Sequence, residues 1–238
     1  MRRIPERELM DLPAEVDAYA AADFSKVNQA FVQRLVELAG HLQTAEALDL
    51  GTGPGDIPVR LLRTLRQGRP GARWTVTAVD ASAGMLACAR RLVEREGLMG
   101  HDARDMQDGP AGSRIHLVQA DAKQLPFADA SFDVVFSNSI LHHINDAASF
   151  WGEVRRVARP GAIIFLRDLA LPGSAEDARR MVQLHAGGES ALLHEEFYRS
   201  LLAAYTVDEV AQQLRAAGLE GLAAAMVTDR HMDVTGRR

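Results

Sequence analysis

Residues 45–56 read AEALDLGTGPGD, and this stretch decides the fold. Its first six residues are mostly apolar and indicate a short buried strand, which runs into three glycines separated by single residues. A helical pattern follows at Ile57–Leu65, where apolar residues return on one face. Glycines in such a turn remove side chains, so a ligand can approach the backbone closely. The stretch therefore predicts a strand, a ligand-binding turn and a helix.

The same alternation continues along the chain. Further strands are predicted at Trp74–Val79, Ile115–Gln119, Asp133–Ser137 and Ala162–Arg167, and further helices at Ala81–Glu96 and Asn145–Ala158. Residues 102–113 are polar and glycine-rich and are predicted to form a loop. The strands are continuous apolar runs, as expected when helices cover both faces of a parallel sheet. The pattern predicts a doubly wound α/β fold.

Helical patterns flank this alternation on both sides. The first 40 residues are helical in pattern, and two more helices are expected at Ser174–His185 and His194–Ala204. Thr206 and Glu209 form a capping box that opens a last helix, which a strand pair follows. We expect a single domain over residues 1–238. Its parts are an N-terminal helical cap (1–40), a core (41–170), a helical insertion that acts as a lid (171–205), and a C-terminal helix with a strand pair (206–238).

Composition bounds the possible partners. The 238 residues are 47% hydrophobic and 25% charged, with a formal net charge of −5, which gives no general attraction to nucleic acid. The single cysteine excludes an internal disulfide and a cysteine metal cage, and it fits a cytoplasmic protein. No apolar run approaches the length of a membrane span, and the N-terminus lacks the pattern of a signal peptide.

The spacing of the glycine turn separates two classes of protein. A nicotinamide-binding turn requires G-x-G-x-x-G, but Asp56 stands where its third glycine belongs. The spacing here is G-x-G-x-G with Asp49 two positions ahead. It resembles motif I of the class I S-adenosylmethionine-dependent methyltransferases, and the resemblance extends over roughly residues 45–170. It implies a mostly parallel, seven-stranded, Rossmann-like sheet, with S-adenosylmethionine as cofactor and S-adenosylhomocysteine as product.

Later motifs occur in the order of that family. Asp80 follows the second strand, where the resemblance implies a ribose carboxylate, although a helix N-cap is the simpler alternative. Asp121 and Ala122 resemble the segment that reads adenine, and a solvated turn is the alternative. The predicted cofactor contacts are Asp49, Gly51, Thr52, Gly53, Gly55, Asp80, Ala81, Met85, Asp121, Ala122, Asn138 and Tyr19.

Candidates for the acceptor side follow the fourth and fifth strands. His142 and His143 form the only adjacent histidine pair, and imidazole suits a general base. We take them as candidate catalytic residues, with His143 preferred, against the alternative that they pack or cap the next helix. Ser139 and Asp168 are candidate substrate contacts. No metal is expected.

The expected function is methyl transfer to a small molecule. The fourth-strand segment lacks the Asn/Asp-Pro-Pro-aromatic signature of enzymes that methylate planar amino groups. Arginines spaced by three after the glycine turn are interpreted as a solvated helix face rather than an RNA contact. The alternatives are a methyltransferase for RNA or protein, a nicotinamide oxidoreductase, and a non-catalytic S-adenosylmethionine-binding domain. The acceptor, the atom methylated and the oligomeric state stay open.

Overall fold

The computed structural model describes residues 1–40, 42–100 and 112–238. Its centre is a seven-stranded sheet with the order β3-β2-β1-β4-β5-β7-β6. All pairs from β3 to β5 are parallel, whereas β7 is antiparallel to both β5 and β6. The strands are β1 Thr44–Leu50, β2 Arg73–Asp80, β3 Arg114–Gln119, β4 Phe132–Asn138, β5 Ala158–Leu169, β6 Leu222–Met226 and β7 His231–Arg237. The predicted doubly wound, mostly parallel fold is confirmed.

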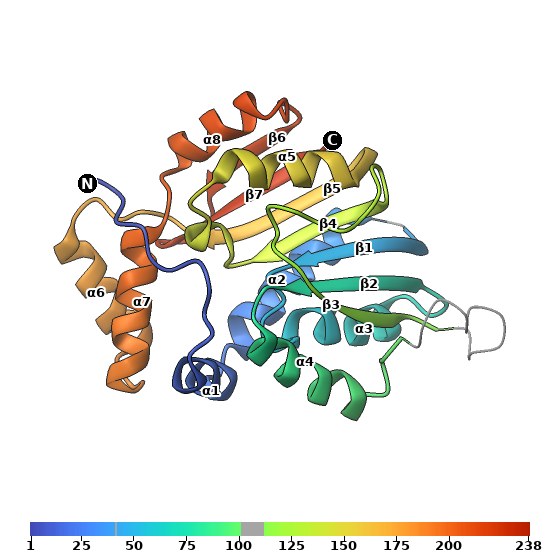
Figure 1. Cartoon of the computed structure of the whole chain (residues 1–238), viewed down its shortest axis with the longest axis horizontal. Coiled ribbons are helices and arrows are strands. Elements are labelled where there is room, and N and C mark those ends of the chain that lie inside the picture. Colours follow the sequence, from blue (N-terminus) through green and yellow to red (C-terminus); the bar gives the residue numbers. More distant parts are fainter. Residues whose placement is uncertain (41, 101–111) are drawn as a thin grey trace.

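Helices cover both faces of this sheet (Figure 1). The helices are α1 Pro13–Ala21, α2 Ser25–Leu38, α3 Asp56–Gly68, α4 Ala83–Arg95, α5 Ala147–Val157, α6 Ala175–Ala186, α7 Ala191–Ala203 and α8 Val207–Ala216, with a 3₁₀ turn, η2, at Leu141–His143. Alternate strand residues enter two separate cores. One core contains residues of α2 and α3, and the other contains residues of α5 and α8.

Side-chain caps mark the starts of several helices. Thr206 and Glu209 form the predicted capping box at the start of α8. Ser174 caps α6 in the same way, because its hydroxyl accepts a hydrogen bond from the Asp177 amide. One predicted boundary moves: the strand predicted at Ala162–Arg167 is longer and begins at Ala158, as β5. The predicted loop at 102–113 lies almost wholly outside the described residues.

The pair α6–α7 has a small apolar core of its own, built around Val182 and Leu201. In Figure 1 this pair lies beyond the end of the sheet that carries η2, and the N-terminal segment passes beside it towards α1. We call residues 1–12 the N-terminal strap. Its Ile4 amide donates to the Leu202 carbonyl of α7 at 2.8 Å, so the strap is joined to this pair.

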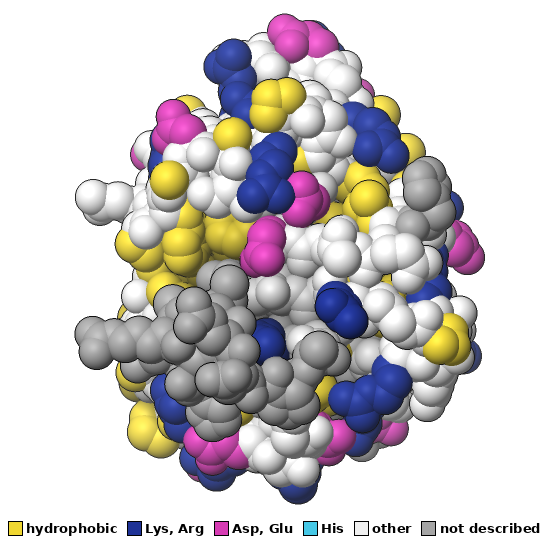
Figure 2. All heavy atoms as spheres, turned by 90° about the vertical axis from the view of Figure 1, so that its right-hand side faces the viewer, with side chains coloured by type: hydrophobic (Ala, Val, Ile, Leu, Met, Phe, Trp, Pro, Cys, Tyr) yellow, Lys and Arg dark blue, Asp and Glu magenta, His cyan; other side chains and the backbone are white. Residues whose placement is uncertain are grey.

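Two surface features bear on the partners. On the face seen in Figure 2, Lys and Arg side chains are scattered among Asp and Glu rather than gathered. Arg60 and Arg63 of α3 pair with Asp56 and Glu96, which favours the interpretation of a solvated helix face. Within the described ranges, no helix is both long and apolar enough to cross a bilayer.

Candidate active site

The glycine turn at the end of β1 needs residues without a side chain. Gly51, Gly53 and Gly55 have φ angles of 70°, 53° and 84°, in the left-handed region that favours glycine. A Cβ on Gly51 would lie only 2.8 Å from Cδ1 of Ile140. The Thr52 amide donates to the Val79 carbonyl at 2.9 Å, which fastens the turn to β2. The turn therefore presents bare backbone beside the carboxyl ends of two adjacent strands.

Asp49 lies directly behind this turn with a carboxylate that is almost fully buried. Among the described residues, none forms a hydrogen bond with its Oδ2. Burial raises the pKa of Asp49 to about 7. Buried polar atoms normally have a partner, so this oxygen indicates a ligand that brings a hydrogen-bond donor or a positive charge.

A cleft of about 260 Å³ opens at this point. Six of the predicted cofactor residues line it, namely Tyr19, Asp49, Gly51, Thr52, Gly53 and Asn138. Tyr19 closes one side, and its ring centroid lies 5.0 Å from that of Phe24. Burial raises the pKa of Tyr19 to about 12, and the Asp80 and Asp168 carboxylates add to this. The cleft thus has an acidic floor, a glycine wall and an aromatic side.

Asp80 supports the turn from the end of β2. Its carboxylate accepts hydrogen bonds from the Gly53 and Ser82 amides, each at 2.8 Å. Burial raises the pKa of Asp80, although these amide hydrogen bonds oppose the effect. The parallel register that pairs Leu50 with Val79 brings this carboxylate to the turn. Each carboxylate oxygen keeps a further lone pair for a ligand.

The remaining predicted cofactor residues lie outside the lining of the cleft. The Asp121 side chain is half exposed and pairs with Lys123 Nζ at 3.0 Å, which favours the solvated-turn alternative in this structure. Ala122 and Met85 are buried, and Ala81 is exposed. Gly55 serves packing, because a Cβ there would lie 3.0 Å from the Ala89 Cβ.

Asn28 is a lining residue that our sequence reasoning missed. Its amide donates to Asp56 Oδ2 at 2.9 Å, and its Oδ1 accepts from Asn138 Nδ2 at 3.3 Å. It lies on the buried stripe of α2 with Phe31 and Leu35. A lone amide on an otherwise apolar helix face was the available signal.

His142 is held by a buried carboxylate. Its Nδ1 lies 2.5 Å from Asp168 Oδ1, and Asp168 also accepts from the Leu141 and Leu169 amides at 2.5 and 2.7 Å. Burial disfavours both charged forms, but their mutual attraction prevails: it raises the pKa of His142 and lowers that of Asp168. An ionised carboxylate only accepts hydrogen bonds, so Nδ1 carries the proton. Asp168 therefore orients His142, and a direct contact with substrate stays a prediction that this geometry does not favour.

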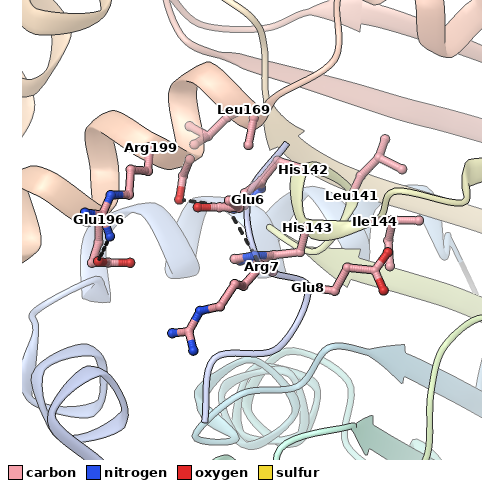
Figure 3. A network of polar contacts seen from close by, with 12 residues as sticks. Glu6, Arg7, Glu8, Leu141, His142, His143, Ile144, Leu169, Glu196 and Arg199 are labelled. Carbon is pink, nitrogen blue, oxygen red and sulfur yellow. Dashed lines mark hydrogen bonds and ion pairs between the residues drawn. The ribbon is translucent and has the colours of Figure 1, made fainter. Parts of the chain in front are cut away.

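His143 has different surroundings. Its Nδ1 lies 3.2 Å from Oε1 of Glu6, a residue of the strap (Figure 3). Burial and the neighbouring His142 lower the pKa of His143 to about 3. Ser139 begins the bend before η2 and has a φ of 67°. Its amide donates a hydrogen bond to the Arg167 carbonyl at 2.8 Å. Sequence reasoning missed Glu6, because it placed the first 40 residues in a helical cap, whereas the strap is not helical and α1 begins at Pro13.

A second cavity of about 320 Å³ lies beside His143. The strap and α7 supply most of its lining, which includes Ile4, Glu6, Met10, Glu196, Arg199 and Leu202. Its wall mixes apolar and charged side chains. The cavity therefore suits a partly apolar molecule that also carries polar groups.

The strand order and the glycine turn at the carboxyl edge define a class, the doubly wound α/β proteins that bind a nucleotide-type cofactor. Comparisons with known proteins show which family within this class the chain matches. The family model described as "Methyltransferase domain" matches residues 48–166. A demethylmenaquinone methyltransferase of Roseiflexus sp. (strain RS-1) is 32% identical over 210 residues, which are 81% of this chain and 78% of the relative.

The chain also resembles the 27-O-demethylrifamycin SV methyltransferase of Amycolatopsis mediterranei (strain S699), with 30% identity over 73% of this chain and 53% of the relative. It thus spans only about half the length of that relative. A crystal structure of a SAM-dependent methyltransferase from Aquifex aeolicus superposes with a TM-score of 0.64 at 18% identity, covering 95% of this chain and 98% of the other. This chain belongs to the S-adenosylmethionine-dependent methyltransferase family. The family match decides against the nicotinamide alternative.

Proposed function

We propose that the protein transfers the methyl group of S-adenosylmethionine to a small-molecule acceptor. The observation that carries the proposal is the buried, unpartnered Asp49 oxygen at the floor of a glycine-walled cleft. A carboxylate there favours a cationic ligand. The relatives named as methyltransferases for a menaquinone precursor and a rifamycin support a small-molecule acceptor.

The residues of the cleft fit this cofactor by chemical type. Asp80 offers acceptor lone pairs to ribose hydroxyls, and Gly51 and Gly53 leave room for a ligand against the backbone. Bound S-adenosylmethionine supplies a methyl group on a positively charged sulfur. Asn138 lines the cleft and Ser139 follows it in the chain before η2, so both are proposed to border the point of transfer. Holding two reactants in line contributes roughly 7–11 kcal/mol to such a displacement.

We assign activation of the acceptor to His142 rather than to His143. Asp168 holds Nδ1 of His142, so Nε2 is the atom that takes the proton, and it faces Glu6 of the strap at 3.7 Å. The carboxylate at Nδ1 of His143 is Glu6, which belongs to the strap rather than to the sheet. His143 lines the cavity beside the strap, which we propose as the acceptor pocket. A partly apolar metabolite with an ionisable hydroxyl fits this lining and this base.

The cofactor part of the proposal is tested by calorimetry with S-adenosylhomocysteine. The wild type is expected to bind, and Asp80→Ala is expected to bind at least about tenfold more weakly, since two hydroxyl contacts are lost. No heat for the wild type would overturn the proposal. Binding without labelled-methyl turnover on any metabolite pool would favour the alternative of a non-catalytic binding domain.

The base is tested by a matched pair of variants, once a pool fraction shows turnover. We expect His142→Gln to lower kcat about 10²–10⁴-fold and His143→Gln to have a smaller effect, with cofactor affinity kept in both. The reverse order would return the role to His143. A cytoplasmic location, the lack of a nucleic-acid partner and the lack of a catalytic metal stay predictions.

A further inference from the structure

The N-terminal strap is fixed on both sides of Glu6. Before it, the Arg3 guanidinium donates to the carbonyls of Ala203 at 2.5 Å and His142 at 2.8 Å. After it, Glu8 Oε1 accepts from the Asn145 amide at 2.7 Å, and Glu8 Oε2 pairs with Lys123 Nζ at 2.8 Å. These anchors hold the Glu6 side chain over η2, as Figure 3 shows.

Glu6 faces both histidines of η2. Its Oε1 lies 3.2 Å from His143 Nδ1 and 3.7 Å from His142 Nε2, and the three ligand atoms all lie within 4.8 Å of one another. Tetrahedral zinc with ligands at 2.0–2.2 Å requires ligand atoms about 3.3–3.6 Å apart. The two measured contacts bracket that spacing.

The surroundings also suit a metal. Asp168 holds Nδ1 of His142, which leaves Nε2 as the ligand atom, and this is the usual carboxylate support of a metal-binding histidine. Within the described part of the chain, the only ion-pair contacts of Glu6 are these two imidazoles. A largely buried carboxylate without Lys or Arg at its oxygens favours an added cation.

We propose that Glu6, His142 and His143 bind a divalent ion of the zinc type, which ties the strap over η2 and inhibits the enzyme. Two imidazoles and one carboxylate select zinc-like ions over Mg²⁺ and Ca²⁺, which prefer oxygen ligands. A zinc ion on Nε2 of His142 occupies the base atom, so the metal-bound form cannot deprotonate an acceptor. Only this inhibition rests on the proposed function. The metal site rests on the ligand geometry alone.

Metal binding is measured on the full chain after removal of metal by a chelator, by zinc competition with a chromogenic indicator. We expect one zinc ion per wild-type chain, and an affinity at least about tenfold weaker in Glu6→Gln and in His143→Gln. Glu37→Gln is the matched control, because this exposed carboxylate of α2 lies outside the strap and its anchors. Cofactor calorimetry and circular dichroism verify the fold of each variant. Equal zinc affinity in wild type, Glu6→Gln and His143→Gln would overturn the site.

Tethering of the strap is measured without any turnover. Arg7 is exposed on the strap, so trypsin can cleave after it once the strap lifts. Zinc is expected to slow this cleavage at least about tenfold in the wild type and in Glu37→Gln, but not in Glu6→Gln. Equal protection in all three would refute the tether.

Inhibition is measured separately, with any acceptor fraction that supports turnover. Zinc is expected to inhibit the wild type at concentrations that leave Glu6→Gln unaffected. Zinc that binds the wild type and does not inhibit it would refute the regulatory role. An absence of cofactor binding would instead refute the proposed function and leave the zinc titration decisive for the site.

Discussion

The substitution Asp49→Asn tests two roles of this buried carboxyl separately. One is its effect on the free energy of unfolding, and the other is its contact with the cofactor. In the folded chain the pKa of Asp49 is about 7, against an ordinary value of 3.8. Below about pH 4 the carboxyl is protonated in both the folded and the unfolded state, so it has no effect on the pH dependence of stability. Between pH 4 and 7 only the unfolded state ionises, so the folded state loses stability as the pH rises.

The size of this loss follows from the difference between the two pKa values. At about 1.4 kcal/mol per pKa unit, the full effect is about 4 kcal/mol above pH 7, and about 2–3 kcal/mol of it develops between pH 5 and 8. Asparagine has nearly the same shape and does not titrate. The free energy of unfolding of D49N relative to wild type should therefore rise by about 2–3 kcal/mol over this interval.

Urea unfolding at pH 5, 6, 7 and 8 measures this difference. Asp17→Asn removes the same charge from an exposed position and controls for net charge. Added S-adenosylmethionine should stabilise the wild type more than D49N at pH 8, because its positive charge favours the ionised carboxylate. A difference that stays constant across the four pH values would refute the assignment of a buried, titrating carboxyl. Equal stabilisation of both proteins would refute its contact with the cofactor.

Two further substitutions test the turn and the histidine pair. Gly51→Ala should lower the free energy of unfolding by about 2–4 kcal/mol, because left-handed backbone strain and the clash with Ile140 add together. Gly71 is the control: its φ is also positive, but no described atom lies within 4 Å of an added Cβ, so Gly71→Ala should show the strain alone. Equal losses in urea titrations would remove the clash from the explanation. Asp168→Asn should lower kcat at least about tenfold while the affinity for S-adenosylhomocysteine is kept, since it releases His142. An unchanged kcat would contradict the orienting role.

Local pattern was sufficient for the sheet and for the glycine turn. Continuous apolar strands alternating with helices admit few arrangements other than a parallel sheet, and the glycine turn has to lie at its carboxyl edge. The Gly53 amide meets the Asp80 carboxylate in the structure, because a turn and the end of the adjacent parallel strand are neighbours in this topology. The role of Asp121 stays a prediction, since a surface lysine two residues along pairs with its carboxylate.

The acceptor end depended on contacts between distant segments. The pairing of Asn138 with Arg167 brings the end of β5 beside the bend after β4, so Asp168 meets His142, which is 26 positions away. Sequence alone offered two adjacent histidines as candidate bases and preferred His143 only slightly. No local pattern shows which of the two rings faces a carboxylate.

By itself, the sequence determined the α/β fold, the glycine turn and the family, because each depends on backbone periodicity or on spacing within a few residues. Only the tertiary structure decided the partner of His142 and the placement of Glu6 on the two histidines. Those contacts follow from strand register and from the anchoring of the strap on α7. Side chains far apart in the chain meet there through packing, which leaves no periodic trace in the sequence.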